Sequence, residues 1–238
     1  MKYCTILLLI PIILWGQSLN NVELTKIDDS VWVHTTYKLF GKNSIPSNGL
    51  VIQTSKGIIL IDTPWDDTLT ISLLDSIHHR FNQSVLFSII THAHQDRIGG
   101  IGALHKNSIT TVSLQMTRDK AKKSGYEIPD RILPMDTVLT FGDQQLEFFY
   151  PGAGHTADNS IVWLPKKKIL FGGCLIKSES FSDLGNISDA NLTQWPASIQ
   201  VLMIKYPSVH VVVPGHGTWG TKNLLNHTLD LLEKVKER

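Results

Sequence analysis

Short apolar runs bounded by turn residues recur along the chain and predict a series of β-strands. Runs of β-branched and apolar residues closed off by Gly, Pro, Asn or Asp are typical of buried strands. The expected strands are 31–37, 50–54, 57–62, 85–90, 109–113, 137–140, 145–150, 160–164, 168–172 and 209–213. Turn residues predict hairpins at Ser55-Lys56-Gly57, Gly142-Asp143 and Pro165-Lys166-Lys167.

Other segments carry apolar residues at helical spacing. Between Asp66 and Phe81 the apolar positions are 69, 73, 74, 77 and 81, and Asp66 or Asp67 is placed to cap the first turn. Further helices are expected just after Gly99-Gly100, at 115–124, at 191–205 and from about residue 221. A sheet-rich first part followed by strands mixed with helices predicts a layered α/β sandwich.

The first residues form a block of their own. An apolar run follows Lys2, and small and polar residues follow the run. The run is too short to span a membrane and has the pattern of a secretory signal peptide, with a buried first helix as the alternative. We therefore expect a signal peptide at 1–18, cleaved after Ser18 or after the competing Gly16, and one domain at 19–238.

Composition narrows the possible partners. The 238 residues are 42% hydrophobic, enough for one large core, and the formal net charge is +1. That charge balance does not favour nucleic acid or an anionic membrane surface. We therefore expect neither kind of partner. Nothing in the sequence demands more than a monomer, which is the expected state. Without the leader only Cys174 remains, so the thiol is buried filler, a reactive group or a ligand rather than half of an internal disulfide.

Four predicted strands end in a loop that carries an imidazole, a carboxylate or a thiol. In chain order these side chains are His92, His94, Asp96, His155, Cys174 and His216. Zinc binds imidazole nitrogen, thiolate and carboxylate, usually with four ligands. Six ligands are too many for one tetrahedral ion, but two catalytic ions with three protein ligands and an open position each account for six. For Asp96, taken by itself, the alternative role is to cap the turn that follows it.

Isolated histidines are usually ordinary core or surface residues. We apply that interpretation to His34, His78, His79, His105, His210 and His227. Accidental placement is a weaker explanation for His92 and His94. The same arrangement, a predicted strand followed by a glycine-containing loop with a candidate ligand, recurs at His155, Cys174 and His216.

The sequences "HAHQD", "GAGHT", "GGC" and "PGHG" resemble the class B metallo-beta-lactamases, in the subclass whose second zinc site uses Asp, Cys and His. The resemblance runs from about residue 24 to the C-terminus. Arg97 stands where the wider superfamily has a further histidine, and Cys174 stands where other branches often have aspartate. These two departures argue against glyoxalase-type thioester hydrolases and against the subclass with the extra histidine. His92 excludes the subclass with asparagine at that position.

The resemblance implies a fold, a metal centre and an activity. The fold is the four-layered αβ/βα sandwich. One zinc is held by His92, His94 and His155, and a second zinc by Asp96, Cys174 and His216. The implied activity is hydrolysis of the beta-lactam ring of penicillins, cephalosporins and carbapenems by metal-bound hydroxide. That activity gives antibiotic resistance, and the leader then fits a bacterial periplasmic enzyme.

The resemblance also implies roles around the metal centre. Lys177 binds the substrate carboxylate, Asn186 helps to polarise the lactam carbonyl, and Asp96 orients the nucleophile. The alternatives are a solvated loop charge for Lys177 and a turn former for Asn186. The segment 38–49 resembles the family's mobile flap, with an ordinary long hairpin as the alternative, and Trp65 is expected to pack near the floor of the site.

Three other functions stay open from the sequence. The first is another metallohydrolase of the same fold that acts on lactones, thioesters or phosphoesters. The second is a zinc-scavenging periplasmic protein, whose metal sites would hold no exchangeable water. The third is a structural module whose buried histidines bind no metal.

Overall fold

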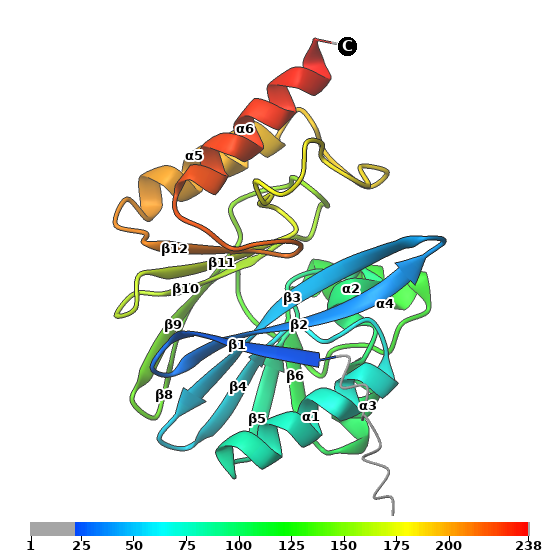
Figure 1. Ribbon diagram of the computed structural model, residues 1–238, viewed down its shortest axis with the longest axis vertical. Helices are drawn as coiled ribbons and strands as arrows, with labels where there is room; N and C mark the ends of the chain where they lie inside the picture. Colours follow the sequence, from blue (N-terminus) through cyan, green and yellow to red (C-terminus); the bar gives the residue numbers. More distant parts are fainter. Residues whose placement is uncertain (1–21, 238) are drawn as a thin grey trace, which may run out of the picture.

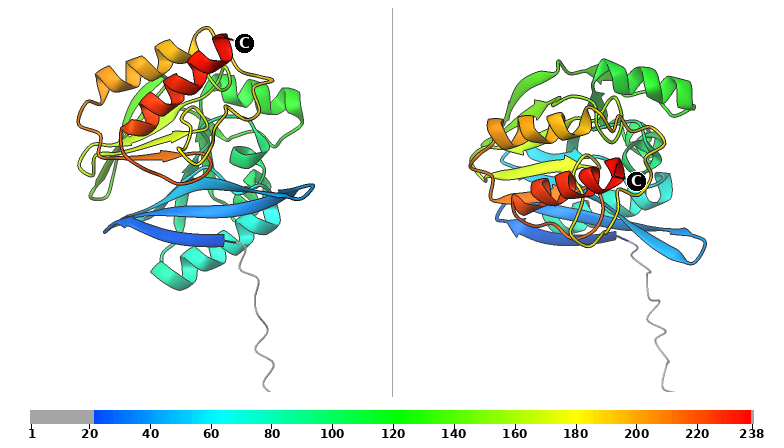
Figure 2. Two further views of the ribbon diagram at one scale, coloured as in Figure 1. Left: turned by 45° about the horizontal axis from the view of Figure 1, so that its top comes forward. Right: turned by 90° about the horizontal axis from the view of Figure 1, so that it is seen from above.

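The computed structural model describes residues 22–237, which fold into four layers of secondary structure. Two β-sheets lie face to face, and helices cover the outer face of each sheet (Figure 1). The left view in Figure 2 shows the same order of helices, sheet, sheet and helices, and the right view looks down on α5 and α6. The predicted αβ/βα sandwich is therefore confirmed, whereas the predicted signal peptide at 1–18 lies outside the described residues.

The first sheet has seven strands that follow one another in chain order, from β1 at one edge to β7 at the other. Strands β1 to β4 are antiparallel to their neighbours, and β4, β5, β6 and β7 run parallel. The strands are β1 Val22–Asp28, β2 Val31–Phe40, β3 Asn43–Thr54, β4 Gly57–Ile61, β5 Val85–Ile89, β6 Thr110–Ser113 and β7 Arg131–Ile132.

The second sheet has five strands in the order β12-β11-β10-β9-β8. Its strands are β8 Asp136–Phe141, β9 Gln144–Phe149, β10 Ile161–Leu164, β11 Ile169–Gly173 and β12 Val211–Pro214. The hairpins β8–β9 and β10–β11 form where the turn residues predict them.

The helices divide between the two outer faces. They are α1 Asp67–Phe81, α2 Gln95–Ile98, α3 Ile101–Lys106, α4 Gln115–Ser124, α5 Trp195–Lys205 and α6 Asn223–Lys236. One apolar cluster joins α1 and α3 to the seven-stranded sheet, and another joins α5 and α6 to the five-stranded sheet. Asp66 caps α1 as predicted, because its Oδ1 accepts a hydrogen bond of 2.9 Å from the Leu69 N–H. Within residues 22–237, no helix has the length and apolar character needed to cross a membrane.

The largest apolar cluster fills the space between the two sheets. Leu50 and Ile52 of β3 point into it, whereas Val51 between them points to the helices. Both faces of the central strands are thus buried, which explains why these strands read as continuous apolar runs instead of alternating ones.

Five features differ from the prediction, each for a local reason. Strands β1 and β7 were not predicted. Strand β1 alternates apolar and polar residues at a sheet edge, and β7 has only two residues. The segment 38–49 is no irregular loop: β2 and β3 pair continuously up to Phe40 and Asn43, so the long hairpin is what forms. The unpredicted α2 is a single short turn. Helix α5 begins at Trp195, four residues late, because Asn191 uses its side chain and carbonyl in a turn before it.

Candidate metal centre

Four strands deliver the candidate ligands to one edge of the sandwich. Strands β9 and β11 are both antiparallel to β10, and β12 is parallel to β11, so the three strands end on the same side. Strand β5 ends opposite them in the other sheet, where the Thr91 carbonyl accepts a hydrogen bond of 3.0 Å from the Ser160 N–H. Ligands that lie far apart in the sequence therefore meet between the two sheets.

The three histidine rings contact one another. The ring centroids lie 4.7 Å apart for His92 and His94, 5.3 Å for His92 and His155, and 5.1 Å for His94 and His155. His94 Nδ1 lies 3.2 Å from His155 Nε2, so these two nitrogens point to the same place. The predicted three-histidine group is thus brought together.

The other three candidates also converge. Cys174 Sγ lies 3.2 Å from Asp96 Oδ2 and 3.4 Å from His216 Nε2, and Asp96 Oδ2 lies 3.1 Å from His216 Nε2. The site is so tight that a Cβ added at Gly215 would lie 2.6 Å from Cys174 Sγ. This contact explains the glycine next to His216.

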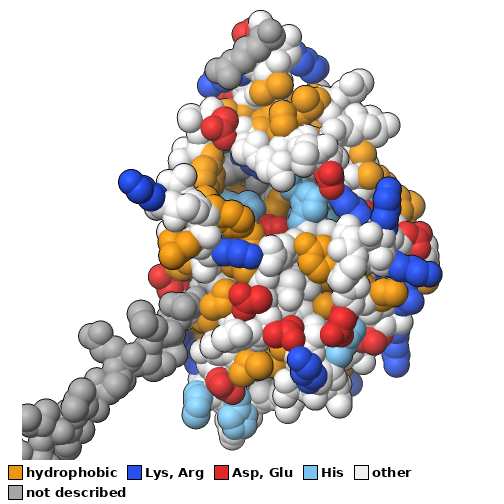
Figure 3. Space-filling view, turned by 90° about the vertical axis from the view of Figure 1, so that its right-hand side faces the viewer, with side chains coloured by type: hydrophobic (Ala, Val, Ile, Leu, Met, Phe, Trp, Pro, Cys, Tyr) orange, Lys and Arg blue, Asp and Glu red, His pale blue; other side chains and the backbone are white. Residues whose placement is uncertain are grey.

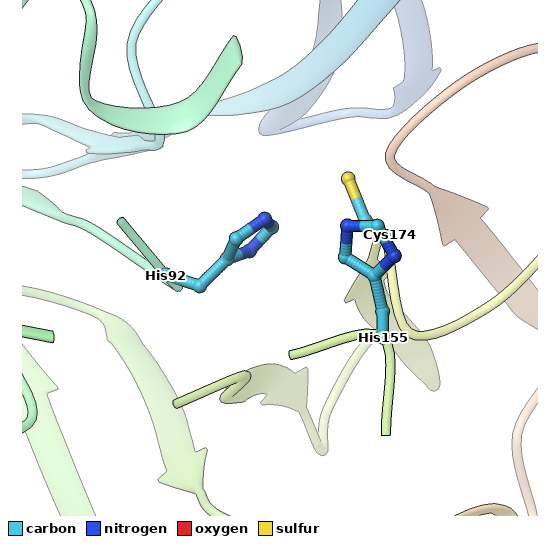
Figure 4. A group of neighbouring side chains, drawn as sticks. All are labelled: His92, His155 and Cys174. Atoms are coloured by element: carbon cyan, nitrogen blue, oxygen red, sulfur yellow. The ribbon is translucent and has the colours of Figure 1, made fainter. Parts of the chain in front are cut away.

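The two groups are not separate clusters. Three sets of side chains each place their ligand atoms within 4.8 Å of one another: His92–His155–Cys174, His92–His94–Asp96 and Asp96–Cys174–His216. Figure 4 shows His92 facing His155 and Cys174 across the first of these sets. The six candidates form one continuous cluster, and none of the six histidines expected to be ordinary joins these sets within the described chain.

The cluster fits a metal such as zinc on two further observations. His92 Nε2 is buried and has no hydrogen-bonding partner among residues 22–237, although buried polar atoms are normally paired. Burial also holds the pKa of His92 and His155 well below the ordinary value, so both imidazoles are neutral and their lone pairs are available. The donor set of nitrogen, sulfur and carboxylate oxygen is the one that zinc prefers.

His216 is oriented from the opposite strand. Its Nδ1 donates a hydrogen bond of 2.6 Å to the Pro46 carbonyl of β3, which turns Nε2 toward Asp96 and Cys174. Burial alone would lower the pKa of His216, but negative charge and hydrogen bonding at the Cys174 sulfur and the Asp96 carboxylate raise it to about 9. The negative character of this corner is what a bound cation would neutralise.

Arg97 holds several parts of the site together. In the sequence it stood out only as a departure from the superfamily pattern. Its side chain is fully buried, and its Nε donates a hydrogen bond of 2.8 Å to Asp96 Oδ2. Its Nη1 donates to the Asn48 carbonyl and its Nη2 to the Gly215 carbonyl, and Nη1 also lies 3.5 Å from Asp62 Oδ2. Although burial would raise the pKa of Asp96, Arg97 and His216 hold it well below its usual value. Only the tertiary structure shows this role.

A cavity of about 650 Å³ opens above the cluster. Its walls include His94, Asp96, His155, His216, Lys177 and Asn186. Figure 3 looks onto this edge and shows histidine surface in the middle of the face among hydrophobic and basic side chains. The volume is that of a typical site for a small molecule.

Lys177 and Asn186 reach this cavity in different ways. Lys177 is 8% exposed, and its Nζ lies 5.5 Å from the centre of the Trp195 ring, so it is no solvated loop charge. Burial lowers its pKa. Asn186 is exposed, and its Oδ1 accepts a hydrogen bond of 3.1 Å from the Ser188 N–H. Asn186 is therefore a turn former that also lines the cavity.

Aromatic side chains close one side of the cavity. Phe40, at the end of the β2–β3 hairpin, packs edge-on against Trp65 with ring centroids 5.5 Å apart. Trp65 in turn lies 6.1 Å from the His216 ring, as expected of a residue at the floor of the site. The hairpin thus reaches over the site while keeping strand structure to its tip.

Residues 44–216 match the metallo-beta-lactamase superfamily. The chain belongs to this superfamily. It is 48% identical over 214 residues to the metallo-beta-lactamase type 2 of Bacillus cereus, covering 90% of this chain and 84% of that protein. It is 34% identical to the metallo-beta-lactamase type 2 of Elizabethkingia meningoseptica over 224 residues, 94% of this chain and 90% of that protein.

Solved metallo-beta-lactamases share the fold. A metallo-beta-lactamase from Pontibacter korlensis superposes with a TM-score of 0.88 at 44% identity, covering 89% of this chain and 99% of that one. The metallo-beta-lactamase FIM-1 from Pseudomonas aeruginosa, in its mono-zinc form, superposes with a TM-score of 0.85 at 32% identity, covering 90% and 96% of the two chains.

These comparisons confirm the family, the class B resemblance and the sandwich fold predicted from the sequence. The curated relatives are bacterial hydrolases of a zinc-dependent family, which confirms the prediction of a hydrolase and supports zinc as its metal.

Proposed function

We propose that this protein is a zinc-dependent beta-lactamase that hydrolyses the lactam ring of penicillins, cephalosporins and carbapenems and so confers antibiotic resistance. The convergence of six zinc-type ligands at the base of a cavity of about 650 Å³, with a buried lysine on its wall, carries the proposal. The relatives named metallo-beta-lactamase type 2 support the reaction class.

The proposed cofactor is a pair of zinc ions. His92, His94 and His155 would hold one, and Asp96, Cys174 and His216 the other. Zinc bound at these ligands supplies a Lewis acid and lowers the pKa of a bound water to about 7. The solved mono-zinc form of FIM-1 belongs to a relative, so the count in this chain is a matter for metal analysis.

The protein's own residues bind and orient the substrate. The Lys177 ammonium is proposed to pair with the substrate carboxylate, because it is the cation on the cavity wall. The Asn186 Oδ1 is used within its own loop, which leaves the Nδ2 amide to donate to the lactam carbonyl. Asp96, held in place by Arg97, is proposed to orient the attacking water.

The remaining sequence predictions belong with this proposal. We propose that residues 1–18 are a signal peptide, that residues 19–238 form one domain, and that the mature protein is a periplasmic monomer. The continuous apolar cluster between the two sheets supports a single domain.

Hydrolysis of imipenem and of a chromogenic cephalosporin by the purified protein tests the activity. We expect turnover of both compounds, loss of that turnover after EDTA treatment, and recovery when zinc is added back, since each ligand group is built for a cation. A parallel panel of lactones, thioesters and phosphoesters is the matched control. Zinc-loaded protein that leaves both beta-lactams intact would contradict the substrate class while leaving the metal centre in place.

A further inference from the structure

A polar network centred on Lys120 touches the three-histidine group from outside the cavity. Lys120 projects from α4, and its side chain is 24% exposed. Its Nζ lies 2.5 Å from Asp189 Oδ2 and 2.6 Å from Thr156 Oγ1. Lys120 is neither a candidate ligand nor part of the cavity wall.

The first branch of the network reaches His94. Asp189 Oδ2 lies 3.0 Å from His94 Nε2, on the opposite side of the ring from the Nδ1 that faces His155. When the carboxylate accepts the Nε2 proton, Nδ1 keeps its lone pair for a metal. Lys120 Nζ is also 3.3 Å from Nε2, but its contact with Asp189 is shorter and pairs opposite charges. Asp189 therefore fixes the ring orientation of His94 and determines that Nε2 carries the proton. Lys120 in turn holds Asp189 in place.

The second branch reaches the backbone beside the other two histidines. Thr156 Oγ1 accepts from Lys120 and donates a hydrogen bond of 2.7 Å to Asp158 Oδ1. The other carboxylate oxygen, Asp158 Oδ2, accepts a hydrogen bond of 2.9 Å from the N–H of Ala93. Ala93 lies between His92 and His94, and Thr156 directly follows His155.

One ammonium group thus contacts two carboxylates that bind different parts of the same metal-binding group. The Asp158 side chain is 2% exposed and the Asp189 side chain is 42% exposed. Lys120 Nζ lies 3.7 Å from Asp158 Oδ1, so its charge offsets a buried carboxylate as well as the exposed one. Without that cation both branches lose their common anchor, although Asp158 keeps its hydrogen bonds from Thr156 and from the Ala93 N–H.

We propose that Lys120 is a positioning residue of the three-histidine group, which it orients through Asp189 at the His94 ring and through Thr156 and Asp158 at the backbone beside the histidines. The proposal rests on the proposed function, because it needs a metal to bind at these histidines. It adds a residue outside the ligand set and outside the cavity that controls zinc affinity.

Replacing Lys120→Met tests this role, because methionine keeps the length of the stem and removes the charge. We expect zinc affinity at one site to fall by about 10- to 100-fold, the range seen for partners that orient metal ligands. Competition with a chromogenic zinc chelator measures it. Lys120→Arg should restore most of the affinity, since arginine keeps the charge and several donors. Lys123→Met, at an exposed position of the same helix, is the matched control and should bind zinc as the wild type does.

Two further measurements separate positioning from a merely structural role. In the cobalt-substituted protein, Lys120→Met should change the d–d bands of the histidine-bound ion and leave the Cys174 thiolate-to-cobalt charge-transfer band intact. In the double variant Lys120→Met/Asp189→Asn, the loss of affinity should be smaller than the sum of the two single losses, because both act through His94. A structural role alone would lower the unfolding midpoint and leave zinc affinity and the spectra unchanged.

The outcomes distinguish this inference from the proposed function. Wild-type protein that binds zinc, together with a Lys120→Met variant of equal zinc affinity and unchanged cobalt spectrum, overturns the role of Lys120 alone. Wild-type protein that binds no zinc overturns the proposed function and the inference with it.

Discussion

The two halves of the candidate metal centre are held in place by opposite means. Arg97 fixes the Asp96–Cys174–His216 half from within, with a guanidinium that is fully buried and bonded to two backbone carbonyls. The three-histidine half is held from outside by Lys120, whose side chain is 24% exposed.

The difference in burial has an energetic consequence. A buried charge is stable only while its partners remain, so removing one partner costs several kcal/mol. An ion pair that water reaches contributes about 1 kcal/mol or less, because solvent screens it. The half held by Arg97 therefore ties metal binding to the stability of the fold, whereas the half held by Lys120 can change zinc affinity with little effect on folding.

The largest effect is expected from Cys174→Ser, which removes a candidate ligand from the half held by Arg97. A hydroxyl binds zinc far more weakly than a thiolate, so the loss of affinity at that site should exceed the 10- to 100-fold typical of outer partners. Metal analysis of dialysed protein should show about one zinc fewer per chain than in the wild type. Unchanged stoichiometry would contradict the ligand role of Cys174.

Next in size is the stability cost of Arg97→Met, which leaves Asp62 and Asp96 buried without their cation. We expect a loss of about 3–5 kcal/mol in the free energy of unfolding, measured by urea denaturation of metal-free protein. Lys120→Met should cost about 1 kcal/mol under the same conditions.

The double variant Arg97→Met/Asp62→Asn is the control for the Arg97 effect. It removes one charge of each sign, so it should recover part of the lost stability. Equal losses for Arg97→Met and Lys120→Met would show that the two halves are held in the same way.

A smaller effect is expected from His34, a fully buried residue of β2 that lies near enough to Arg97 to feel its charge. Its Nε2 donates a hydrogen bond of 3.2 Å to the Ile61 carbonyl, and burial lowers its pKa to about 4. Because the unfolded pKa is about 6.5, the unfolded chain takes up the proton first as the pH falls. Stability therefore falls as the pH drops from 6.5 toward 4, by about 2 kcal/mol between about pH 7.5 and about pH 5.

His34→Gln isolates this contribution. Glutamine can still donate to the Ile61 carbonyl but does not titrate, so the variant should lose about 2 kcal/mol less than the wild type over the same pH interval. Urea denaturation of both metal-free proteins at the two pH values measures the difference. Parallel losses in the two proteins would rule out His34 as a source of acid sensitivity.

The smallest effect is expected from Asn186→Ala at the rim of the cavity. Asn186 is exposed and partly engaged with Ser188, so its amide is less well fixed than a donor held in a buried site. We expect kcat/KM to fall by less than about 100-fold, the lower bound for a preorganised oxyanion donor. Steady-state kinetics with imipenem measures it, and a larger fall would mean that the loop is rigid in the substrate complex.

Local patterns predicted most of the fold. The positions of many elements follow from nearby residues, because apolar spacing, capping residues or turn residues mark them. Examples are the paired strands β10 and β11 and the helices α1 and α4. Strands β1 and β7 were missed because an edge strand and a two-residue strand depend on the neighbouring strand more than on their own sequence.

The network residues of the site could not be predicted in the same way. Asp189 meets His94 across 95 residues of chain, and no motif joins them. Arg97 stood beside a predicted ligand, but a charged residue is usually exposed, so its complete burial had no signal in the sequence.

The sequence by itself determined the chemistry: six side chains of zinc-binding type, each placed where an apolar strand ends in a loop. That information is local, because the type of a ligand and the apolar run of a strand can both be recognised from neighbouring residues. The tertiary structure alone decided that the six ligands form one continuous cluster, that Arg97 stabilises one half from a dry interior, and that Lys120 holds the other half from the surface. Those facts depend on how two sheets and a helix pack, and packing sets distances between residues that the chain itself keeps far apart.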